Sequence, residues 1–409
     1  MYLTALDIGS SQIKVLVAQL NNDNKLTLIE IAKYPSAGVR KGEVVDVAEL
    51  SSALAGVFNE IKGIHKDVLK NIFVNISGKN IKMQSSRGIV AVSRADNEIY
   101  QDDLDRVIKA SQAINLPPNR KIIHTIIQEY IIDGAEQMQS PIGMSGTRLE
   151  VNSLIVDAFT PVLNDLTKSI ETAGGNIAGV IYNPLASAEA ALTKTHKELG
   201  VVLVDIGFAT TCISIFEENK LISAKVFPVG SANITNDLAI ALKSSINLAE
   251  HIKTAYGYAF SKDVSVREKI NLAELDKGAK GIVSKKFISD IIESRLAEIF
   301  ELVHNELKSL GKTELPAGVI LCGGGAKVPG IIDLAKNELK LPVHLGDCQL
   351  NISDAANRDL NARLDDLEFI GVTGLLVQGE SQFDSEENVS GWFSDKKGFI
   401  SKIFKNLVP

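Results

Sequence analysis

The chain has 409 residues, of which 45% are hydrophobic, and it carries a formal net charge of −7 at pH 7. A chain of this length outgrows a single hydrophobic core, so we expect several subdomains. Its acidic balance, with no basic arm that carries interleaved aromatic residues, argues against binding to nucleic acid.

The first predicted elements form a lobe that we begin at residues 1–84. A hairpin, LDIGSSQIKVLV at 6–17, comes first, and its two strands meet at a glycine turn. A strand near 26–34, a helix near 47–64 and a strand at 71–77 follow it.

A separate αβ unit, assigned to residues 85–165, then interrupts this lobe. Its predicted elements are strands at 87–94, 121–133 and 147–159, a helix at 101–114, and the start of a helix at 161–172. The first lobe resumes at 166–195, where a further helix is predicted at 183–192.

The following residues predict a second lobe. Residues 196–230 and 312–350 form its inner part, and the mainly helical residues 231–311 form its outer part. Residues 351–378 are expected to return to the first lobe.

Two similar hairpins and a third glycine loop predict a clamp for nucleotide phosphates. VDIGFATTCISI at 204–215 repeats the first hairpin, and ILCGGGAKVPGI at 320–331 predicts a strand, a glycine loop and a helix start. Glycine lets backbone N–H groups approach an anion closely. Asp7 and Asp205 occupy matching positions, where they would offer oxygen acceptors to hydrated Mg²⁺. One such turn alone is usually a plain bend, and the repeat favours the clamp.

The cysteines and the N-terminal residues bear on the cellular compartment. Cys212, Cys322 and Cys348 form no CxxC pair, which is typical of a reducing cytosol. Cys212 and Cys322 are expected to be buried small hydrophobic residues. We expect no signal peptide, and no apolar run reaches the roughly eighteen residues that span a bilayer, so a soluble or peripheral protein is predicted.

The three glycine turns, in this order, resemble the two phosphate loops and the adenosine loop of the actin, Hsp70 and sugar-kinase superfamily. NPLASAEAAL at 183–192 and FIGVTGLLVQG at 369–379 resemble its two connecting helices. HTIIQEYIIDG at 124–134, followed by SPIGMSGTRLEV at 140–151, closely resembles the bacterial division family FtsA. The resemblance implies an α/β, two-lobed actin-like fold with an FtsA-type αβ insertion subdomain in the first lobe.

The resemblance also implies ATP and Mg²⁺ as cofactors. INLAEHIKTAYGYA at 246–259 resembles the FtsA segment beside the ribose and adenine, with Glu250 and Lys253 on one helical face. The alternative for these two residues is a solvated i,i+3 ion pair. Asp7 and Asp205 are assigned to the metal. The cofactor-binding residues are expected to be Asp7, Gly9, Ser10, Ser11, Lys14, Asp205, Gly207, Ala209, Thr210, Thr211, Glu250, Lys253, Gly323, Gly324, Gly325 and Lys327.

The chain departs from the family pattern in the second phosphate loop and the first connecting helix. Phe208 and Ala209 replace glycines, and Cys212 stands where many FtsA chains have an aspartate. Phe208 is expected to point away from the phosphates. Asn183 occupies the place of a water-positioning glutamate in several actin-like relatives, and an amide is not a base at neutral pH. We expect nucleotide binding with slow hydrolysis, at most a weak ATPase, and assign no catalytic residue.

The C-terminal residues predict a tether and a membrane-binding helix. GESQFDSEENVSG at 379–391 is acidic and poor in apolar residues, which is typical of a flexible linker. Residues 392–409 form an amphipathic pattern with four lysines, suited to an anionic membrane interface. The alternative is a terminal helix docked on the protein's own core. The expected membrane-binding residues are Trp392, Phe393, Phe399, Ile400, Lys402, Ile403, Phe404, Lys405 and Leu407.

The family resemblance implies a structural role in cell division. The protein would polymerise head to tail and tether FtsZ filaments to the cytoplasmic face of the inner membrane at the division site. Lys285, Lys286 and Arg295, the last on a helix at 287–303, would receive the FtsZ C-terminal peptide, unless they belong to a solvated face. The insertion would receive later division proteins.

Two other functions remain open from the sequence. A PilM-like pilus assembly protein would share the lobes and the insertion, but would leave the acidic tether and the terminal helix unexplained. A small-molecule kinase of the same superfamily would require an acidic base that faces a substrate cleft.

Overall fold

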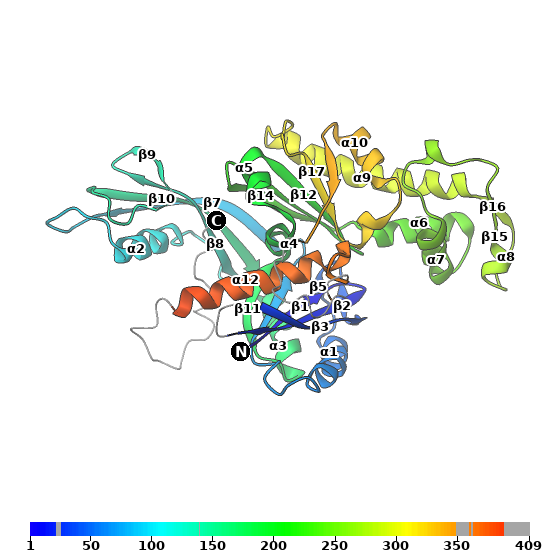
Figure 1. Cartoon of the computed structure of the whole chain (residues 1–409), viewed down its shortest axis with the longest axis horizontal. Helices are drawn as coiled ribbons and strands as arrows, with labels where there is room; N and C mark the ends of the chain where they lie inside the picture. The colour runs from blue at the N-terminus through cyan, green and yellow to red at the C-terminus, as the bar shows by residue number, and fades with distance from the viewer. Residues whose placement is uncertain (22–25, 139, 349–359, 361–362, 388–409) are drawn as a thin grey trace.

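The computed structural model describes residues 1–21, 26–138, 140–348, 360 and 363–387. Two lobes lie beside each other, and a smaller subdomain projects from them (Figure 1). Among the described helices, none combines the length and the apolar character needed to cross a membrane.

The first lobe is built on a five-stranded sheet with the order β11-β6-β1-β2-β3. Its strands are β1 (Tyr2–Ile8), β2 (Gln12–Leu20), β3 (Leu26–Pro35), β6 (Ile72–Ile76) and β11 (Ile177–Tyr182). Helices α1 (Val47–Ile61) and α3 (Thr160–Thr172) pack on this sheet through one continuous core. A second core lies between the sheet and α12 (Ile370–Glu387).

The second lobe repeats this plan. Its five-stranded sheet has the order β14-β13-β12-β17-β18, so a hairpin again pairs in parallel with a later strand on one side. The strands are β12 (Val201–Ile206), β13 (Thr211–Glu217), β14 (Lys220–Phe227), β17 (Val319–Cys322) and β18 (Val343–Leu345). The predicted duplication of the lobes is therefore confirmed in strand order and direction.

The outer part of the second lobe is mainly helical, as predicted. Its principal helices are α6 (Ser231–Leu242), α7 (Ile246–Tyr256) and α9 (Lys285–Ser309). They pack with α10 (Ile331–Leu339) on a shared apolar core. A small ladder of β15 (Lys269–Asn271) and β16 (Ile282–Ser284) lies at the edge, with the single turns η1 (Ser261–Asp263) and α8 (Leu272–Leu275).

The inserted subdomain is a four-stranded antiparallel sheet with one helix. The sheet order is β7-β10-β8-β9, and α2 (Gln101–Ser111) packs on it. The strands are β7 (Ile81–Ala91), β8 (Arg120–Ile132), β9 (Ala135–Met138) and β10 (Arg148–Phe159). In Figure 1 this subdomain and the outer part of the second lobe project from opposite ends of the molecule.

The insertion differs from its predicted boundaries at both ends. Strand β7 begins at Ile81, because it pairs with β10 over its whole length, as far as Ala158. Helix α3 packs against α1, so the residues from Thr160 onward belong to the first lobe and not to the insertion. The boundary residues are exposed and intermediate in turn, and that pattern alone does not reveal which sheet they join.

Strand β8 of the insertion contacts both lobes. Gln128 donates to the Leu221 carbonyl at 2.9 Å, and Glu129 pairs with Lys220 at 2.7 Å. His124 accepts from the Tyr182 N–H at 2.9 Å, one residue before the first connecting helix. Burial lowers the pKa of His124 to about 4, so this imidazole is neutral and acts as an acceptor at physiological pH.

Two connecting helices join the lobes, at the predicted places. The first is α4 (Asn183–Ala191), followed by the short α5 (Lys194–Leu199). The second, α12, crosses α4, and a Cβ at Gly374 would lie 1.7 Å from the Ala186 carbonyl oxygen. Only glycine permits this close approach.

The tether predicted from residue 379 is wrong for its first residues. Helix α12 continues through Glu387, because its buried early turns have already nucleated it and glutamate, glutamine and serine extend a helix at small cost. Gly379 lies against Phe73, where a Cβ would come within 2.5 Å of the ring. The rest of the tether and the predicted amphipathic helix at 392–409 lie outside the described residues.

Candidate nucleotide-binding site

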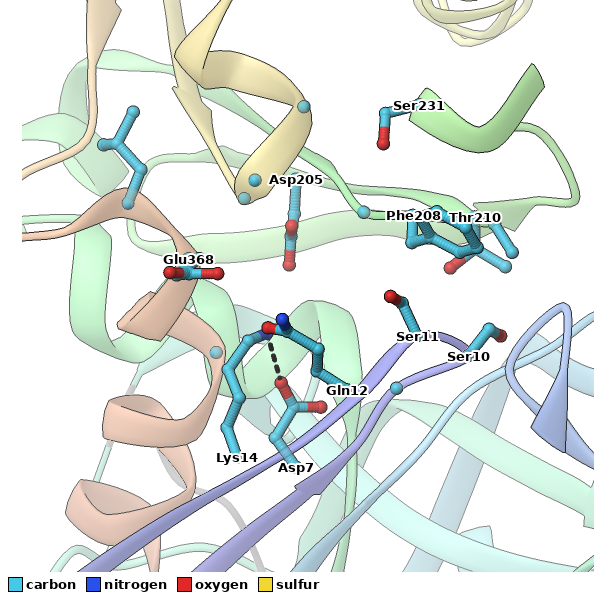
Figure 2. A pocket seen from close by; sticks show the side chains of 18 of the residues that line it. Asp7, Ser10, Ser11, Gln12, Lys14, Asp205, Phe208, Thr210, Ser231 and Glu368 are labelled. Carbon is cyan, nitrogen blue, oxygen red and sulfur yellow. Dashed lines mark hydrogen bonds and ion pairs between the residues drawn. The ribbon is translucent and has the colours of Figure 1, made fainter. Parts of the chain in front are cut away.

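A cavity of about 470 Å³ lies where the two lobes face each other. It is lined by the turn between β1 and β2, the turn between β12 and β13, and the glycine loop after β17 (Figure 2). All three predicted glycine turns therefore meet in one place. The volume is within the range of small-molecule and cofactor sites.

The two hairpin turns have the same geometry. The Gly9 N–H donates to the Gln12 carbonyl at 3.0 Å, and the Gly207 N–H donates to the Thr210 carbonyl at 2.9 Å. A Cβ on either glycine would lie 2.9 Å from that carbonyl oxygen. Each turn is thus closed tightly enough to require glycine, and each faces the cavity from its own lobe.

Asp7 and Lys14 are directly opposed residues of the first hairpin. The Lys14 ammonium lies 3.1 Å from one Asp7 oxygen, and the Asn75 amide donates to the other at 2.6 Å. Burial lowers the pKa of Lys14, but the carboxylates of Asp7, Asp205 and Glu368 outweigh it and raise the pKa above its ordinary value. Lys14 is therefore a fixed positive charge in the cavity.

Asp205 holds the matching position in the second hairpin. It accepts from the Ser187 hydroxyl at 2.7 Å and from the Asn183 amide at 3.5 Å. Burial raises the pKa of Asp205, although these donors and Lys14 oppose the shift. A cation or a hydrogen-bond donor placed beside such a buried carboxylate stabilises its ionised form.

Two buried thiols flank Asp205 in neighbouring strands. Cys212 is its antiparallel partner and Cys322 its parallel partner. Burial and the nearby Asp205 charge raise the pKa of Cys212 to about 12, and the pKa of Cys322 is also raised. Both thiols are neutral and buried, which confirms that they act as small hydrophobic residues.

The third glycine loop follows β17 with three consecutive glycines. Gly323 has a φ of +83°, and a Cβ there would lie 2.3 Å from an Asp205 oxygen. A Cβ at Gly325 would lie 2.4 Å from Ile206, whereas one at Gly324 meets nothing within 4 Å. The first and third glycines fit the loop to β12, and the second is open to the cavity.

Glu250 and Lys253 on α7 pair with each other at 2.7 Å and also line the cavity. Lys253 is buried and donates to the Thr235 hydroxyl at 2.9 Å. The same hydroxyl donates to Glu250 at 2.5 Å. The i,i+3 ion pair and the predicted position at the cavity are therefore both present.

A charged cluster crosses the hinge at the cavity wall. Glu368, in η3 (Leu367–Phe369), pairs with Lys33 of the first lobe at 2.8 Å and with Lys327 of the second lobe at 3.3 Å. Lys327 also pairs with Asp366 at 2.5 Å. Burial raises the pKa of Glu368, but both lysines outweigh it and leave the pKa below the ordinary value.

All but one of the predicted cofactor-binding residues line the cavity. The exception is Thr211, which is fully buried and donates to the Val229 carbonyl at 2.9 Å. Phe208 also lines the cavity and is 40% exposed.

Sequence reasoning missed several polar residues that line the same cavity. They are Gln12, Lys33, Asn75, Ser77, Ser231, Thr254 and Glu368. Ser231 had a sequence signal, because a serine after Gly230 begins a helix directly behind the second phosphate loop. Lys33 and Glu368 had none, because their contact joins residues 335 positions apart.

The donor set suits a hydrated magnesium ion held partly by a ligand. Asp7 and Asp205 both line the cavity, one on each hairpin. Within the described residues, no group of three or more His, Cys, Asp or Glu side chains could enclose a metal by itself. Two carboxylates with substrate phosphates and retained waters are a usual arrangement for Mg²⁺.

The predicted partner-binding residues have acidic neighbours in the same chain. Arg295 donates to Asp237 from two nitrogens, at 2.7 and 3.1 Å, and to Glu298 at 2.5 Å. The Arg295 side chain is only 25% exposed, because Asp237 of α6 faces it, so Arg295 does not belong to a fully solvated face.

Lys285 and Lys286 stand at the start of the same helix. Lys285 pairs with Glu268 at 3.2 Å. Lys286 donates to the Ser261 carbonyl at 3.0 Å and lies 3.7 Å from Asp290.

Comparison with known families and proteins gives consistent matches. The model described as "Cell division protein FtsA" matches residues 202–365, and "SHS2 domain inserted in FTSA" matches residues 78–157. Cell division protein FtsA of Bacillus subtilis is 35% identical over 336 residues, which cover 82% of this chain and 76% of that protein. The FtsA of Borreliella burgdorferi is 31% identical over 405 residues, which cover 98% of this chain and 97% of that protein.

Solved structures resemble the chain in fold alone. The PilM–PilN type IV pilus biogenesis complex gives a TM-score of 0.65 at 16% identity and covers 92% of this chain and 98% of that one. MreB5 of Spiroplasma citri bound to ADP gives a TM-score of 0.56 at 13% identity and covers 95% and 98%.

Proposed function

The chain belongs to the FtsA family of cell division proteins, in the actin-like superfamily, and on that premise we propose that it binds ATP·Mg²⁺ between its lobes. The observation that carries this proposal is the meeting of two duplicated hairpin turns and a glycine loop around one cavity. A ligand that touches all three turns would link the lobes and fix the angle between them.

The phosphates would lie between the two hairpins. Lys14 supplies a permanent positive charge, and the turn residues Ser10, Ser11 and Thr210 supply hydroxyl and backbone donors. Mg²⁺ would neutralise phosphate charge, with Asp7 and Asp205 as acceptors for its hydration shell. The adenosine would lie toward Gly324, Glu250 and Lys253, as the family resemblance implies.

We expect hydrolysis in this cavity to be slow. Asn183 stands at the start of the first connecting helix and its amide cannot take a proton from water. The Cys212 thiol is buried and neutral, so it does not replace a carboxylate. The bound nucleotide is therefore proposed to act as a structural clasp in a protein that is at most a weak ATPase.

The proposed cellular role is to connect FtsZ filaments to the membrane. The protein would polymerise head to tail, with the outer part of the second lobe receiving the FtsZ C-terminal peptide near Lys285, Lys286 and Arg295. The insertion, at the far end of the molecule in Figure 1, would be free to meet later division proteins. The family premise and the separation of these two surfaces support this arrangement.

Membrane attachment is proposed through residues 392–409, at the cytoplasmic face of the inner membrane at the division site. The support is the sequence pattern, in which an apolar face with Phe399, Ile403 and Leu407 opposes a lysine-bearing face. Anionic lipid would attract the lysines.

A role like that of PilM in pilus assembly is the second candidate. The fold likeness to the PilM–PilN complex favours it, but that likeness has only 16% identity. Relatives at 31–35% identity over most of the chain are division proteins.

One titration tests the central proposal. The full chain is mixed with a fluorescent ATP analogue, with and without Mg²⁺, and the analogue is displaced with ATP, ADP or GTP. Tighter binding with Mg²⁺ and displacement by ATP are expected. A chain that binds no nucleotide at millimolar concentrations would contradict the clasp. A parallel pull-down with immobilised FtsZ and PilN peptides separates the two cellular roles.

A further inference from the structure

Helix α6 holds the second phosphate loop through two amides of its first turn. The Ser231 N–H donates to the Gly207 carbonyl at 2.9 Å, and the Ala232 N–H donates to the Phe208 carbonyl at 2.7 Å. Gly230, just before the helix, has no room for a side chain, since a Cβ would lie 2.7 Å from both carbonyl oxygens. The loop therefore rests directly on the N-terminus of α6.

These two hydrogen bonds decide where the loop's own donors point. In a trans peptide, the carbonyl and the N–H of the next residue point in opposite directions. Because the carbonyls of Gly207 and Phe208 face α6, the N–H groups of Phe208 and Ala209 face away from it. Both residues line the cavity, so these N–H groups are available to the proposed phosphates.

Helix α6 is held by α7 through the Thr235 hydroxyl and by α9 through an ion pair. The Arg295 Nε donates to one Asp237 oxygen at 2.7 Å and its Nη2 to the other at 3.1 Å. Asp237 stands about 9 Å beyond Ser231 along the helix axis. A bidentate guanidinium–carboxylate pair sets both a distance and an angle.

Apolar packing does not set this position by itself. Ile234 and Leu238 bury α6 against the lobe, which fixes its depth. The hydrophobic contribution is non-directional, so the directional contacts of α6 are its hydrogen bonds and its ion pair. The Asp237–Arg295 pair is directional, and its side chains are 25–30% exposed, so solvent screens the interaction in part.

We propose that Asp237 and Arg295 are positioning residues for the nucleotide phosphates, acting through α6 on the second phosphate loop. The proposal rests on the proposed ATP site, and it adds that this ion pair tunes phosphate affinity more strongly than adenosine affinity. Adenosine would contact the third glycine loop, which the pair does not touch, and Glu250 and Lys253 of α7, which reach α6 through the Thr235 hydroxyl.

The test compares two ligands on the full chain. ATP and adenosine affinities are measured with Mg²⁺ for wild type, Asp237→Asn and Arg295→Gln. We expect ATP affinity to fall by about fivefold in each variant, in the range of coupling through packed elements, with a smaller change in adenosine affinity. The double variant should lose no more than either single variant, because both act on one contact.

Glu298→Gln is the matched control. Glu298 accepts from Arg295 but stands on the same helix, α9, and is 58% exposed, so its loss leaves α6 in place. Ala232→Pro tests the first step separately, since it deletes one loop-holding N–H. Proline stands in the first turn of α3 and α4, so the helix itself accepts it there, while its Cδ would push the Phe208 carbonyl away from α6.

The outcomes separate cleanly. A larger loss of affinity for ATP than for adenosine in Asp237→Asn, Arg295→Gln and Ala232→Pro supports the proposal. Equal loss for ATP and adenosine, no loss for either, or the same loss in Glu298→Gln overturns it. Should Asp237→Asn not fold, Asp237→Glu, which keeps the charge and moves the carboxylate, decides by the same comparison. Absence of ATP binding in the wild type would instead count against the proposed function.

Discussion

Lys14 and Asp7 face each other across the β1–β2 ladder, with the ammonium 3.1 Å from the carboxylate. The same ammonium also interacts electrostatically with Asp205 and Glu368, so three carboxylates stabilise one positive charge in the cavity. A phosphate chain entering between the hairpins would meet a positive charge that is already in place. Because the pKa of Lys14 is raised, this charge does not change with pH in the physiological range.

The first prediction is that Lys14→Met weakens the binding of ATP far more than the binding of adenosine. A hydrogen bond to a charged group contributes about 1.5–3 kcal/mol, which corresponds to about a 10- to 150-fold loss of ATP affinity. The loss of Lys14 also leaves Asp7 and Asp205 facing the phosphates without compensation. Equilibrium titration with ATP, ADP and adenosine measures how the loss of affinity differs among the three ligands.

Lys14→Arg is the control for charge alone, and it should retain part of the affinity. Since the pKa of Lys14 is raised above its ordinary value, the wild-type affinity should not fall between pH 7 and pH 9 through loss of this proton. A Lys14→Met chain that binds ATP as tightly as wild type would contradict the assigned role.

The second prediction is that Gly324→Val abolishes ATP binding in a folded protein. A Cβ at Gly324 meets no protein atom within 4 Å, so the fold tolerates the side chain, which would then occupy the cavity. Gly56→Ala, at an exposed helical position that is equally open, is the control. A Gly324→Val chain with unchanged thermal unfolding and unchanged ATP affinity would place the adenosine elsewhere.

Local patterns in the sequence predicted the hairpins and the duplication, because both depend on residues close together in the chain. The repeat of Asp, Ile and Gly at 7–9 and 205–207 follows the same β-turn requirement in each lobe. The sheet order then repeats as well.

The contacts that the sequence did not reveal join distant residues. Lys33 and Glu368 meet only after both lobes and the hinge have packed, and Asp237 reaches Arg295 only when α6 and α9 lie together. The helical start of the predicted tether was missed for a similar reason, since its composition favours disorder while the packed α12 extends it. Composition describes an isolated segment, and tertiary packing decided these cases.

The third prediction is that Asn183→Glu raises the rate of ATP hydrolysis. The Asn183 amide lies 3.5 Å from an Asp205 oxygen, so a carboxylate placed there would have its pKa raised by the like charge. A base with a pKa nearer neutrality accepts a proton from water more effectively, and general-base catalysis contributes about 10²- to 10⁴-fold. Phosphate release under saturating ATP measures the rate.

Asn183→Gln is the matched control, because it lengthens the side chain without adding a base. An Asn183→Glu chain that binds ATP normally and hydrolyses it no faster than the Gln variant would show that attacking water does not lie beside this position.

The fourth prediction concerns the FtsZ peptide. Lys285→Glu and Lys286→Glu should each weaken binding of the acidic peptide by up to about 1 kcal/mol, or about fivefold, because exposed charge pairs contribute modestly. Arg295→Glu should weaken it further, but it also places a carboxylate against Asp237 and Glu298. Peptide affinity must therefore be read together with ATP affinity for that variant.

Lys308→Glu, in the last turn of the same helix, controls for net charge. Fluorescence anisotropy of a labelled FtsZ C-terminal peptide gives the affinities. Equal affinity in all three lysine variants and wild type would show that the peptide binds away from the start of α9.

The last prediction tests the membrane anchor, whose residues lie outside the described part of the structure. Burying a large apolar side chain contributes about 1.5–3 kcal/mol when it is complete, and each lysine near an anionic surface adds about 1 kcal/mol. Partial burial and helix ordering reduce these gains, so one helix should bind reversibly, and a polymer should attach firmly through many weak anchors. Deletion of 392–409 should abolish co-sedimentation with anionic liposomes and leave ATP binding intact.

Phe404→Glu should act nearly the same way, while Ser401→Glu, on the opposite half of the helical wheel, should weaken binding only slightly. Salt should release the protein only in part, because the apolar contribution is not screened. A truncated chain that still pellets with the liposomes would favour a terminal helix docked on the protein's own core.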